Sequence, residues 1–395
     1  MKRFRILLFL FLLYGMAVHA KPLVLSEAAE ISLLTSTPID DRVYTLYGHT
    51  SVRVHDPQQN VDLLFNYGIF SFDKPNFIYR FAKGETDYML EAYPLQDFVI
   101  ECQIRGSGLT EQVLNFTQAE KQALWEALVE NAQPENRVYR YNFFFDNCAT
   151  RPAVLVEKYT QGKIDYADPG ERHTFRELIN YCTRNHPWLT FGCDLVLGSP
   201  TDREATPHEE FFLPQYLERA FAKATILQPD GSTRPLVKAT RTLTEEATRE
   251  TSEKPLFTPL VCSLFLLAFV LLVTWTERRK KTYYRWVDVL LFSIAGLCGI
   301  VLFFLSFISV HPSMWPNVWL IWLHPLHLAG AFFFMVKKLN KAAYFYHFIN
   351  FAALTLLLLG TGFVSQHVNE AFIPLILCLW IRSGYSLIRK KWNIE

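Results

Sequence analysis

Five apolar segments in the last part of the chain constrain its fold more than any other feature. Each is close to the length that crosses a bilayer as a helix, and they lie at about residues 256–275, 287–310, 318–336, 343–363 and 371–388. An all-α bundle of five transmembrane helices is therefore predicted for residues 255–395.

The loops between these segments differ in charge, and the difference predicts their orientation. Basic residues gather at 277–281, 337–341 and 389–391, whereas the loops at 311–317 and 365–370 contain no Lys or Arg. Basic loops stay on the cytoplasmic side of a membrane. The part of the chain before the bundle is thus predicted to form one domain outside the cytoplasm, residues 21–254, and the carboxyl terminus to lie inside.

The amino terminus has the composition of a secretory signal peptide. Lys2, Arg3 and Arg5 precede an apolar run at residues 6–13, and Ala20 ends a short segment suited to cleavage. We expect residues 1–20 to be removed, with a retained signal anchor as the alternative. The formal net charge of +1 argues against nucleic acid as a partner.

Secretion would place the external domain in an oxidising compartment, so the seven cysteines are sorted by position. Cys182 and Cys193 flank a short loop and are predicted to form a disulfide, with two free buried thiols as the alternative. Cys102 falls in an alternating pattern at residues 98–104 and is expected in a strand of the core. Cys262, Cys298 and Cys378 lie in the apolar segments and are expected to be inert, which leaves Cys148 unpaired.

Alternating apolar and polar residues predict an antiparallel sheet in the first part of the external domain. Strands are expected at residues 45–54, 62–68, 89–95 and 98–105, and the turn-rich residues 55–60 predict a hairpin connection. Helix periodicity follows at residues 117–131, where Thr117 and Glu120 form a capping box. A loop-rich region at 162–214 contains a further helical stretch at 175–185, and a strand or two is expected before the membrane.

Cys148 lies where the start of a helix would activate a thiol. An apolar approach at residues 141–145 ends in Asp146 and Asn147, which are helix-capping residue types, and a helix is predicted to run from there to about Gln161. The N–H groups at a helix start lower the pKa of a thiol placed among them. Cys148 is therefore the candidate nucleophile, although a single cysteine is more often a small core residue.

His49 begins a predicted strand and is the candidate base for this thiol. Folding back through the hairpin would bring Asn66 or Tyr67 opposite His49, so Asn66 is predicted to orient the imidazole, with Asp62 and Tyr67 as rivals. Backbone N–H groups at the helix start, joined by Asn147, would stabilise an oxyanion. A structural histidine on a strand is the alternative.

Ionisable residues also occur inside the apolar segments. His324 and His327 interrupt the third segment, and Arg382 lies in the fifth. Such residues favour a functional role, here a contact with lipid phosphate or a polar seam between helices. Snorkelling is the alternative for Arg382. No metal site is predicted, because the histidines and cysteines lack ligand spacing, and no cofactor is expected.

The motifs together resemble those of the Lnb-type lipoprotein N-acyltransferases. The resemblance rests on residues 47–50 (Tyr-Gly-His-Thr), 65–68 (Phe-Asn-Tyr-Gly), 146–151 (Asp-Asn-Cys-Ala-Thr-Arg) and 194–214, and it extends through the five apolar segments. The order of His before Cys is also similar to that of circularly permuted papain-like domains. The resemblance implies an α+β papain-like, circularly permuted NlpC-type periplasmic domain followed by the membrane bundle.

The same resemblance implies an apolipoprotein N-acyltransferase of the bacterial inner membrane. Cys148 would accept an acyl chain from a phospholipid as a thioester, and the α-amine of a diacylglyceryl-cysteine lipoprotein would take it over, with His49 as the base in both halves. The implied partners are the phospholipid donor, the lipoprotein acceptor and the membrane. The alternatives are a thiol phospholipase, a cell-wall amidase or peptidase, and a non-enzymatic binding protein.

Overall fold

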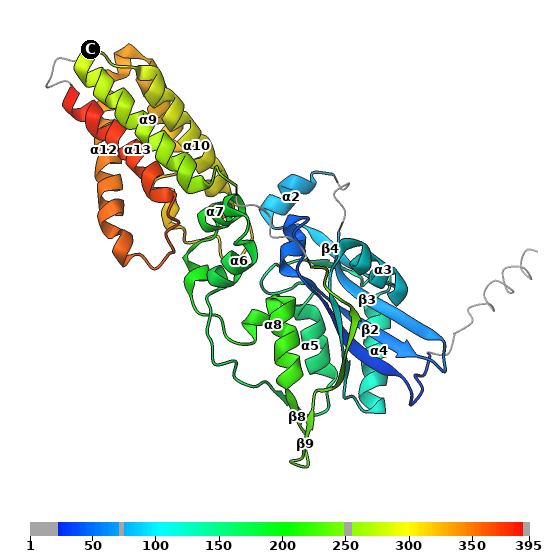
Figure 1. The fold of residues 1–395 in the computed structure, drawn as a ribbon. Coiled ribbons are helices and arrows are strands. Elements are labelled where there is room, and N and C mark those ends of the chain that lie inside the picture. Colours follow the sequence, from blue (N-terminus) through cyan, green and yellow to red (C-terminus); the bar gives the residue numbers. More distant parts are fainter. Residues whose placement is uncertain (1–22, 71–74, 249–254, 390–395) are drawn as a thin grey trace, which may run out of the picture.

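The computed structural model describes residues 23–70, 75–248 and 255–389. Within these ranges an α+β domain is joined to a bundle of long helices, which extends away from the strands (Figure 1). The expected signal peptide at residues 1–20 and the basic residues 390 and 391 lie outside the described residues.

An antiparallel sheet forms the centre of the α+β domain. Its seven strands are β1 (Glu30–Ser36), β2 (His49–Asp56), β3 (Val61–Ile69), β4 (Asp87–Pro94), β5 (Leu109–Leu114), β6 (Val138–Arg140) and β10 (Val237–Thr244), and their spatial order is β10-β5-β1-β2-β3-β4-β6. The strands predicted at 45–54, 62–68 and 89–95 are confirmed as β2, β3 and β4. β2 begins only at His49, because the residues before it form the short 3-10 helix η1 (Val43–Tyr47).

Helices cover both faces of this sheet. Leu33 packs into a cluster with side chains of α4 (Gln118–Asn131), α5 (Thr150–Tyr159) and α8 (Pro214–Lys223). The next residue, Leu34, packs into a separate cluster with Phe98 and Cys102 of α3 (Leu95–Arg105). Successive side chains of a strand point to opposite faces, so α3 lies on one face and the other three helices on the other.

The prediction of a strand at residues 98–105 is wrong, because this segment belongs to α3. Its buried residues Leu95, Phe98 and Cys102 follow at spacings of three and four, which is the period of a helix rather than a strand. Gly106 ends the helix at a φ of 66°, a conformation that favours glycine. Cys102 is buried as expected, but on a helix.

The predicted helices of the external domain are present. Thr117 and Glu120 form the expected capping box of α4, with Thr117 N–H donating to Glu120 at 2.6 Å. The stretch predicted at 175–185 is α6 (Phe175–Thr183). The loop-rich region also holds α7 (Pro187–Val196), which was not predicted, and contributes to a small sheet of β7 (Lys163–Asp165), β8 (Thr225–Leu227) and β9 (Thr233–Pro235).

The bundle contains α9 (Pro259–Lys280), α10 (Arg285–Phe307), α11 (Leu326–Met335), α12 (Asn340–Gly360) and α13 (Phe372–Ile388). Among the described residues, four stretches are long and apolar enough to cross a membrane, at 259–280, 285–307, 318–335 and 337–363. The third is interrupted, since the 3-10 helix η4 (Val318–Ile321) precedes α11. α13 is apolar but has only 17 residues, so a fifth crossing stays a prediction.

Arg382 does not contact lipid, because it is fully buried among three helices. Its guanidinium pairs with Glu277 of α9 and Asp288 of α10, each at 2.5 Å, and donates to Thr274 at 3.1 Å. Both carboxylates are themselves buried. The predicted lipid-phosphate contact and snorkelling are thus both wrong for Arg382, and the polar seam between helices is the arrangement observed.

Replacing Arg382 with methionine should destabilise the bundle strongly. Two buried carboxylates would then lack their cation, and such a loss costs about 3–5 kcal/mol. Thermal unfolding of the full chain in detergent measures the effect, with Arg279→Met as the control because Arg279 is an exposed cation near the end of α9. Equal melting temperatures for the two variants would contradict a stabilising role for the seam.

His327 does not contact lipid either. Its ring is buried, with Nδ1 2.5 Å from the Tyr346 hydroxyl and Nε2 2.9 Å from the Trp322 carbonyl. His324 stacks on it with a 3.9 Å separation of ring centroids, and its Nδ1 is buried without a hydrogen-bond partner. The predicted lipid contact is therefore wrong for the buried His327, whereas for the half-buried His324 it stays a prediction.

The α+β domain is joined firmly to the outer end of the bundle. Gly198 N–H donates to Ser313 O at 2.7 Å and Ser199 N–H donates to Pro316 O at 2.9 Å, just after α7. In addition, Asn369 donates to the buried carboxylate of Asp194 at 2.8 Å. These bonds fix the position of the α+β domain relative to the membrane helices.

Candidate functional site

The predicted thiol lies in a tight turn that leads into α5. The helix begins at Thr150, so Cys148 precedes its first turn rather than lying inside it. Asn147 caps this turn: its side-chain oxygen accepts from Ala149 N–H at 2.8 Å and from Thr150 N–H at 3.0 Å. Asp146 pairs instead with Arg151 at 2.6 Å. The Asp-Asn pair therefore shapes the turn that presents the sulfur.

Asn147 is a support and not an oxyanion donor. Its amide nitrogen carries two hydrogens, and these donate to Phe143 O and Phe212 O, both at 2.8 Å. The residue is 2% exposed. The predicted donor role is thus wrong, since one hydrogen of the amide is used within the turn and the other by the carbonyl of Phe212.

The start of β2 brings His49 to the same place. Gly48 has a φ of +75°, and a Cβ there would lie 2.8 Å from Ser36 O, so the close approach requires glycine. His49 Nε2 lies 2.5 Å from Asn66 Oδ1, and the Asn66 amide donates to the Tyr93 hydroxyl at 2.6 Å. Asn66 is 5% exposed, so this chain of bonds holds the imidazole from inside the domain.

Asn66 meets His49 by a different geometry from the one predicted. The register of β2 and β3 pairs Val52 with Phe65, which puts Gly68 opposite His49. Asn66 lies two residues earlier on the same side, and reaches the ring diagonally. The rivals are engaged elsewhere: Asp62 pairs with Arg53 at 2.7 Å, and the Tyr67 hydroxyl accepts from Asn131.

This arrangement determines the tautomer of the imidazole. The amide oxygen of Asn66 can only accept, so Nε2 of His49 carries the hydrogen. Nδ1 is then the nitrogen with a free lone pair in neutral His49, and it can take the proton of a thiol. The order of groups is Cys148, His49, Asn66 and Tyr93.

Cys148 and His49 shift each other's pKa. Burial alone would raise the pKa of the Cys148 thiol, but the charge and hydrogen bond of His49, with the N–H groups of Thr50 and of Cys148, lower the net pKa. Burial alone would lower the pKa of His49, but the charge and hydrogen bond of Cys148 and the bond to Asn66 raise it. The two groups therefore favour a thiolate–imidazolium pair.

Aromatic side chains that were not predicted as site residues lie near Cys148 and His49. Tyr88 and Tyr141 stack at 4.0 Å, and Phe98 lies 6.2 Å from the His49 ring. Burial, with a contribution from the charge of Cys148, raises the pKa of Tyr88 to about 12, so this hydroxyl stays protonated. Tyr141 opens the apolar approach to Cys148, which is the sequence signal that could have identified it.

Gly68 was also not predicted as a site residue, and it lies beside both Cys148 and His49. The ladder between β3 and β4 shifts register there, and Gly68 has a φ of +99°. A Cβ at this position would be 3.4 Å from Cys148 Cβ and 3.8 Å from His49 Cε1. Both distances are those of ordinary van der Waals contact, so the positive φ of the bulge, rather than a lack of space, favours glycine beside the thiol and the imidazole.

Gly68→Ala should slow reactions of the thiol without unfolding the domain. We expect a loss of about 1 kcal/mol in stability from the positive φ, and about a tenfold slower alkylation of Cys148 because the backbone beside the pair must shift to relieve that strain. Gly231→Ala is the matched control, since Gly231 has a φ of +83° and open space around its Cβ. Equal alkylation rates in the two variants would show that the contact at Gly68 is unimportant.

Cys182 and Cys193 do not form the predicted disulfide, and both are free thiols. Spacing suggested a bridge, but α6 and α7 place each thiol in an aromatic cluster beside Tyr47. Burial raises the pKa of each to about 11, so neither is a thiolate at neutral pH. The observed state is close to the alternative, since both thiols are free, but they are half-buried rather than buried.

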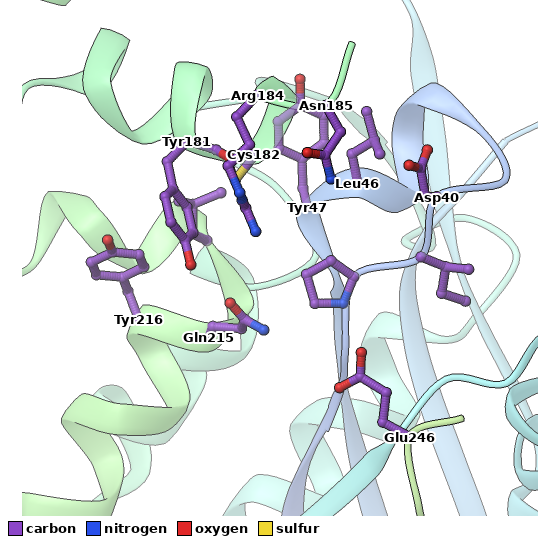
Figure 2. Close-up of a pocket in the computed structure, with 13 residues that line it drawn as sticks. Asp40, Leu46, Tyr47, Tyr181, Cys182, Arg184, Asn185, Gln215, Tyr216 and Glu246 are labelled. Atoms are coloured by element: carbon purple, nitrogen blue, oxygen red, sulfur yellow. The ribbon is translucent and has the colours of Figure 1, made fainter. Parts of the chain in front are cut away.

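A hollow of about 220 Å³ lies on this side of Tyr47. Figure 2 shows Tyr181, Arg184 and Gln215 around it, with Glu246 on the opposite wall. Neither Cys148 nor His49 lines it. Among the described residues, no group of three His, Cys, Asp or Glu side chains is arranged to hold a metal ion.

The fold and the site together define a class: a membrane protein whose α+β domain holds a thiol, an imidazole and an amide in series. Residues 24–181 match the family model of the Lnb N-terminal periplasmic domain, and residues 250–392 match that of the Lnb transmembrane domain. The chain therefore belongs to the Lnb family, as the sequence motifs predicted. Neither curated proteins nor solved structures gave a match.

Proposed function

We propose that this protein is an apolipoprotein N-acyltransferase, with Cys148 as the nucleophile. The observation that carries the proposal is the thiol with a lowered pKa beside His49, whose imidazole is held by Asn66, in a periplasmic domain bound to membrane helices. A thiolate is the form that attacks an ester. The order of strand histidine before helix cysteine also fits the permuted papain-like fold expected from the sequence.

In the first half-reaction, Cys148 Sγ attacks an ester carbonyl of a phospholipid. The ester C–O bond breaks, the acyl group remains on sulfur as a thioester, and the lysophospholipid oxygen takes the proton from His49 Nδ1. Three of the N–H groups at positions 147 to 150 bond to side chains of the turn, whereas that of Cys148 lies beside its own sulfur. This N–H is the proposed oxyanion donor.

In the second half-reaction, the α-amine of a diacylglyceryl-cysteine lipoprotein attacks the thioester. His49 accepts the proton of the amine, the C–S bond breaks, and the thiolate is restored. Both substrates are held in the membrane by acyl chains, and the bonds from Gly198 and Ser199 to the loop after α10 hold the thiol domain against the bundle. The proposed location is the bacterial inner membrane, with the α+β domain in the periplasm and the carboxyl terminus in the cytoplasm.

Product analysis of the full chain in phospholipid vesicles tests this function. A synthetic diacylglyceryl-cysteine lipopeptide serves as the acceptor, and mass spectrometry measures both products. We expect N-acylated lipopeptide and lysophospholipid in equal amounts. Free fatty acid with unmodified lipopeptide would identify a phospholipase instead, and unchanged lipids would contradict acyl transfer altogether.

A further inference from the structure

The short helix α2 (Phe77–Lys83) exposes an unusually apolar surface. It contains no buried residue, and Ile78, Tyr79 and Phe81 are 83%, 54% and 53% exposed. Figure 1 shows α2 projecting from the sheet on the side of the bundle. Adjacent exposed apolar side chains of this kind mark an interaction surface.

α2 is attached directly to the membrane helices. Val310 N–H donates to Lys83 O at 2.8 Å, and His311 Nε2 donates to Phe81 O at 2.8 Å. A Cβ on Gly84 would lie 3.0 Å from the backbone nitrogen of His311, so the two segments are in close contact. Both bonds come from the residues that follow α10, at its outer end.

The apolar side of α2 also reaches the depth of a membrane helix. Tyr79 contacts Phe304 at 6.0 Å between ring centroids, and Phe304 lies in the last turn of α10. The cations of α2 are paired within the domain, since Arg80 contacts Asp87 at 2.5 Å and Lys83 contacts Glu85 at 2.7 Å. The exposed surface of α2 is therefore aromatic and aliphatic, as in helices that lie at the membrane interface.

A continuous series of aromatic contacts leads from α2 to the thiol. Phe77 stacks on Phe70 at 6.1 Å, Phe70 contacts Tyr88 at 4.9 Å, and Tyr88 stacks on Tyr141 at 4.0 Å. The series reaches the thiol through the end of β3, because Phe70 follows Gly68 by two residues and a Cβ on Gly68 would lie 3.4 Å from Cys148 Cβ. An extended apolar chain lying on this series would run from the bilayer to Cys148.

We infer that α2 inserts into the outer leaflet and, with Phe70 and Tyr88, forms the surface along which the acyl chain of a phospholipid reaches Cys148. This inference rests on the proposed function, because it assigns the entry route of the acyl donor. An acyl chain is the occupant that the surface fits: the surface is apolar, its cations are paired, and it is continuous with the outer end of a membrane helix.

The test compares two matched pairs of substitutions in the full chain in phosphatidylethanolamine vesicles. The test variant combines Ile78→Ser with Phe81→Ser on α2. The control variant combines Ile100→Ser with Ile104→Ser on α3, which lies away from the bundle (Figure 1). The control side chains are also exposed, at 43% for Ile100 and 81% for Ile104. Intact mass measures acylation of Cys148 by the lipid, and p-nitrophenyl acetate measures the reactivity of the thiol with a soluble ester. We expect the α2 pair to reduce acylation by lipid at least roughly tenfold, with the soluble ester unaffected, and the α3 pair to change neither.

A second measurement does not depend on acyl transfer. p-Benzoylphenylalanine replaces Phe81 or, as the control, Ile104, in a Cys148→Ala background in the same vesicles. Phospholipid adducts at position 81 but not at 104 support the inference, even if the wild-type thiol is never acylated and the proposed function fails. No adduct at position 81, or acylation by lipid that is unchanged in the α2 pair, overturns the inference while leaving the transferase intact.

Discussion

Replacing Cys148 with alanine should abolish N-acylation of lipoproteins. The proposed reaction passes through a thioester on this sulfur, so we expect a loss of at least roughly 10⁴-fold in transfer. The measurement is mass spectrometry of the amino terminus of a reporter lipoprotein, in cells depleted of their own N-acylating enzyme and expressing either form.

Cys182→Ala is the matched control for this experiment. It removes a thiol of the same domain, partly buried like Cys148, but its pKa is raised to about 11 rather than lowered. We expect the control to acylate the reporter as the wild type does. Transfer that survives Cys148→Ala would keep the function and refute the mechanism, whereas a free amine with the wild type would refute the function.

His49→Gln should shift the ionisation of Cys148 and reduce transfer by about 10²–10⁴-fold. The lowered pKa means that alkylation of the wild-type thiol by iodoacetamide should rise at a lower pH than that of an ordinary thiol, whose pKa is about 8.5. Without the cation of His49, burial remains and raises the pKa. The rise of alkylation with pH should therefore move above 8.5, and the rate at pH 7 should fall at least roughly tenfold.

Asn66→Ala separates orientation from charge. The imidazole remains, but Nε2–H loses the acceptor at 2.5 Å, so the ring can adopt the other tautomer. We expect transfer to fall more than the alkylation rate does, because alkylation needs only the thiolate.

The His49→Gln experiment has its own refuting outcome. An alkylation profile that is the same in wild type and His49→Gln would refute the thiolate–imidazolium pair.

Features carried by neighbouring residues could be predicted from the sequence. The approach to Cys148 ends in a capping residue, and Asn147 does form the turn before α5. His49 could be placed at a strand start, and the hairpin predicted that Asn66 lies near it. The prediction of a strand at residues 98–105 was wrong because the spacing of apolar residues in a short run fits a strand and a helix alike.

Features that depend on remote partners could not be predicted. The side chain of Asn147 donates to the carbonyl of Phe212, a remote residue, so its hydrogen is not available to an oxyanion. The carboxylates that pair with Arg382 likewise lie on other helices. The disulfide failed for the same reason: Cys182 and Cys193 are close in the chain, but bridging requires a geometry that the packing of α6 and α7 determines.

The sequence by itself determined the class of most segments: apolar helices for the membrane, a sheet of alternating residues, and a capped turn that presents a thiol. These follow from hydropathy, periodicity and local hydrogen bonding, which act over a few residues. Only the tertiary structure decided that the bulge at Gly68 lies against both Cys148 and His49, and that α2 contacts the loop after α10. Such contacts join residues far apart in the chain, so they depend on how whole elements pack.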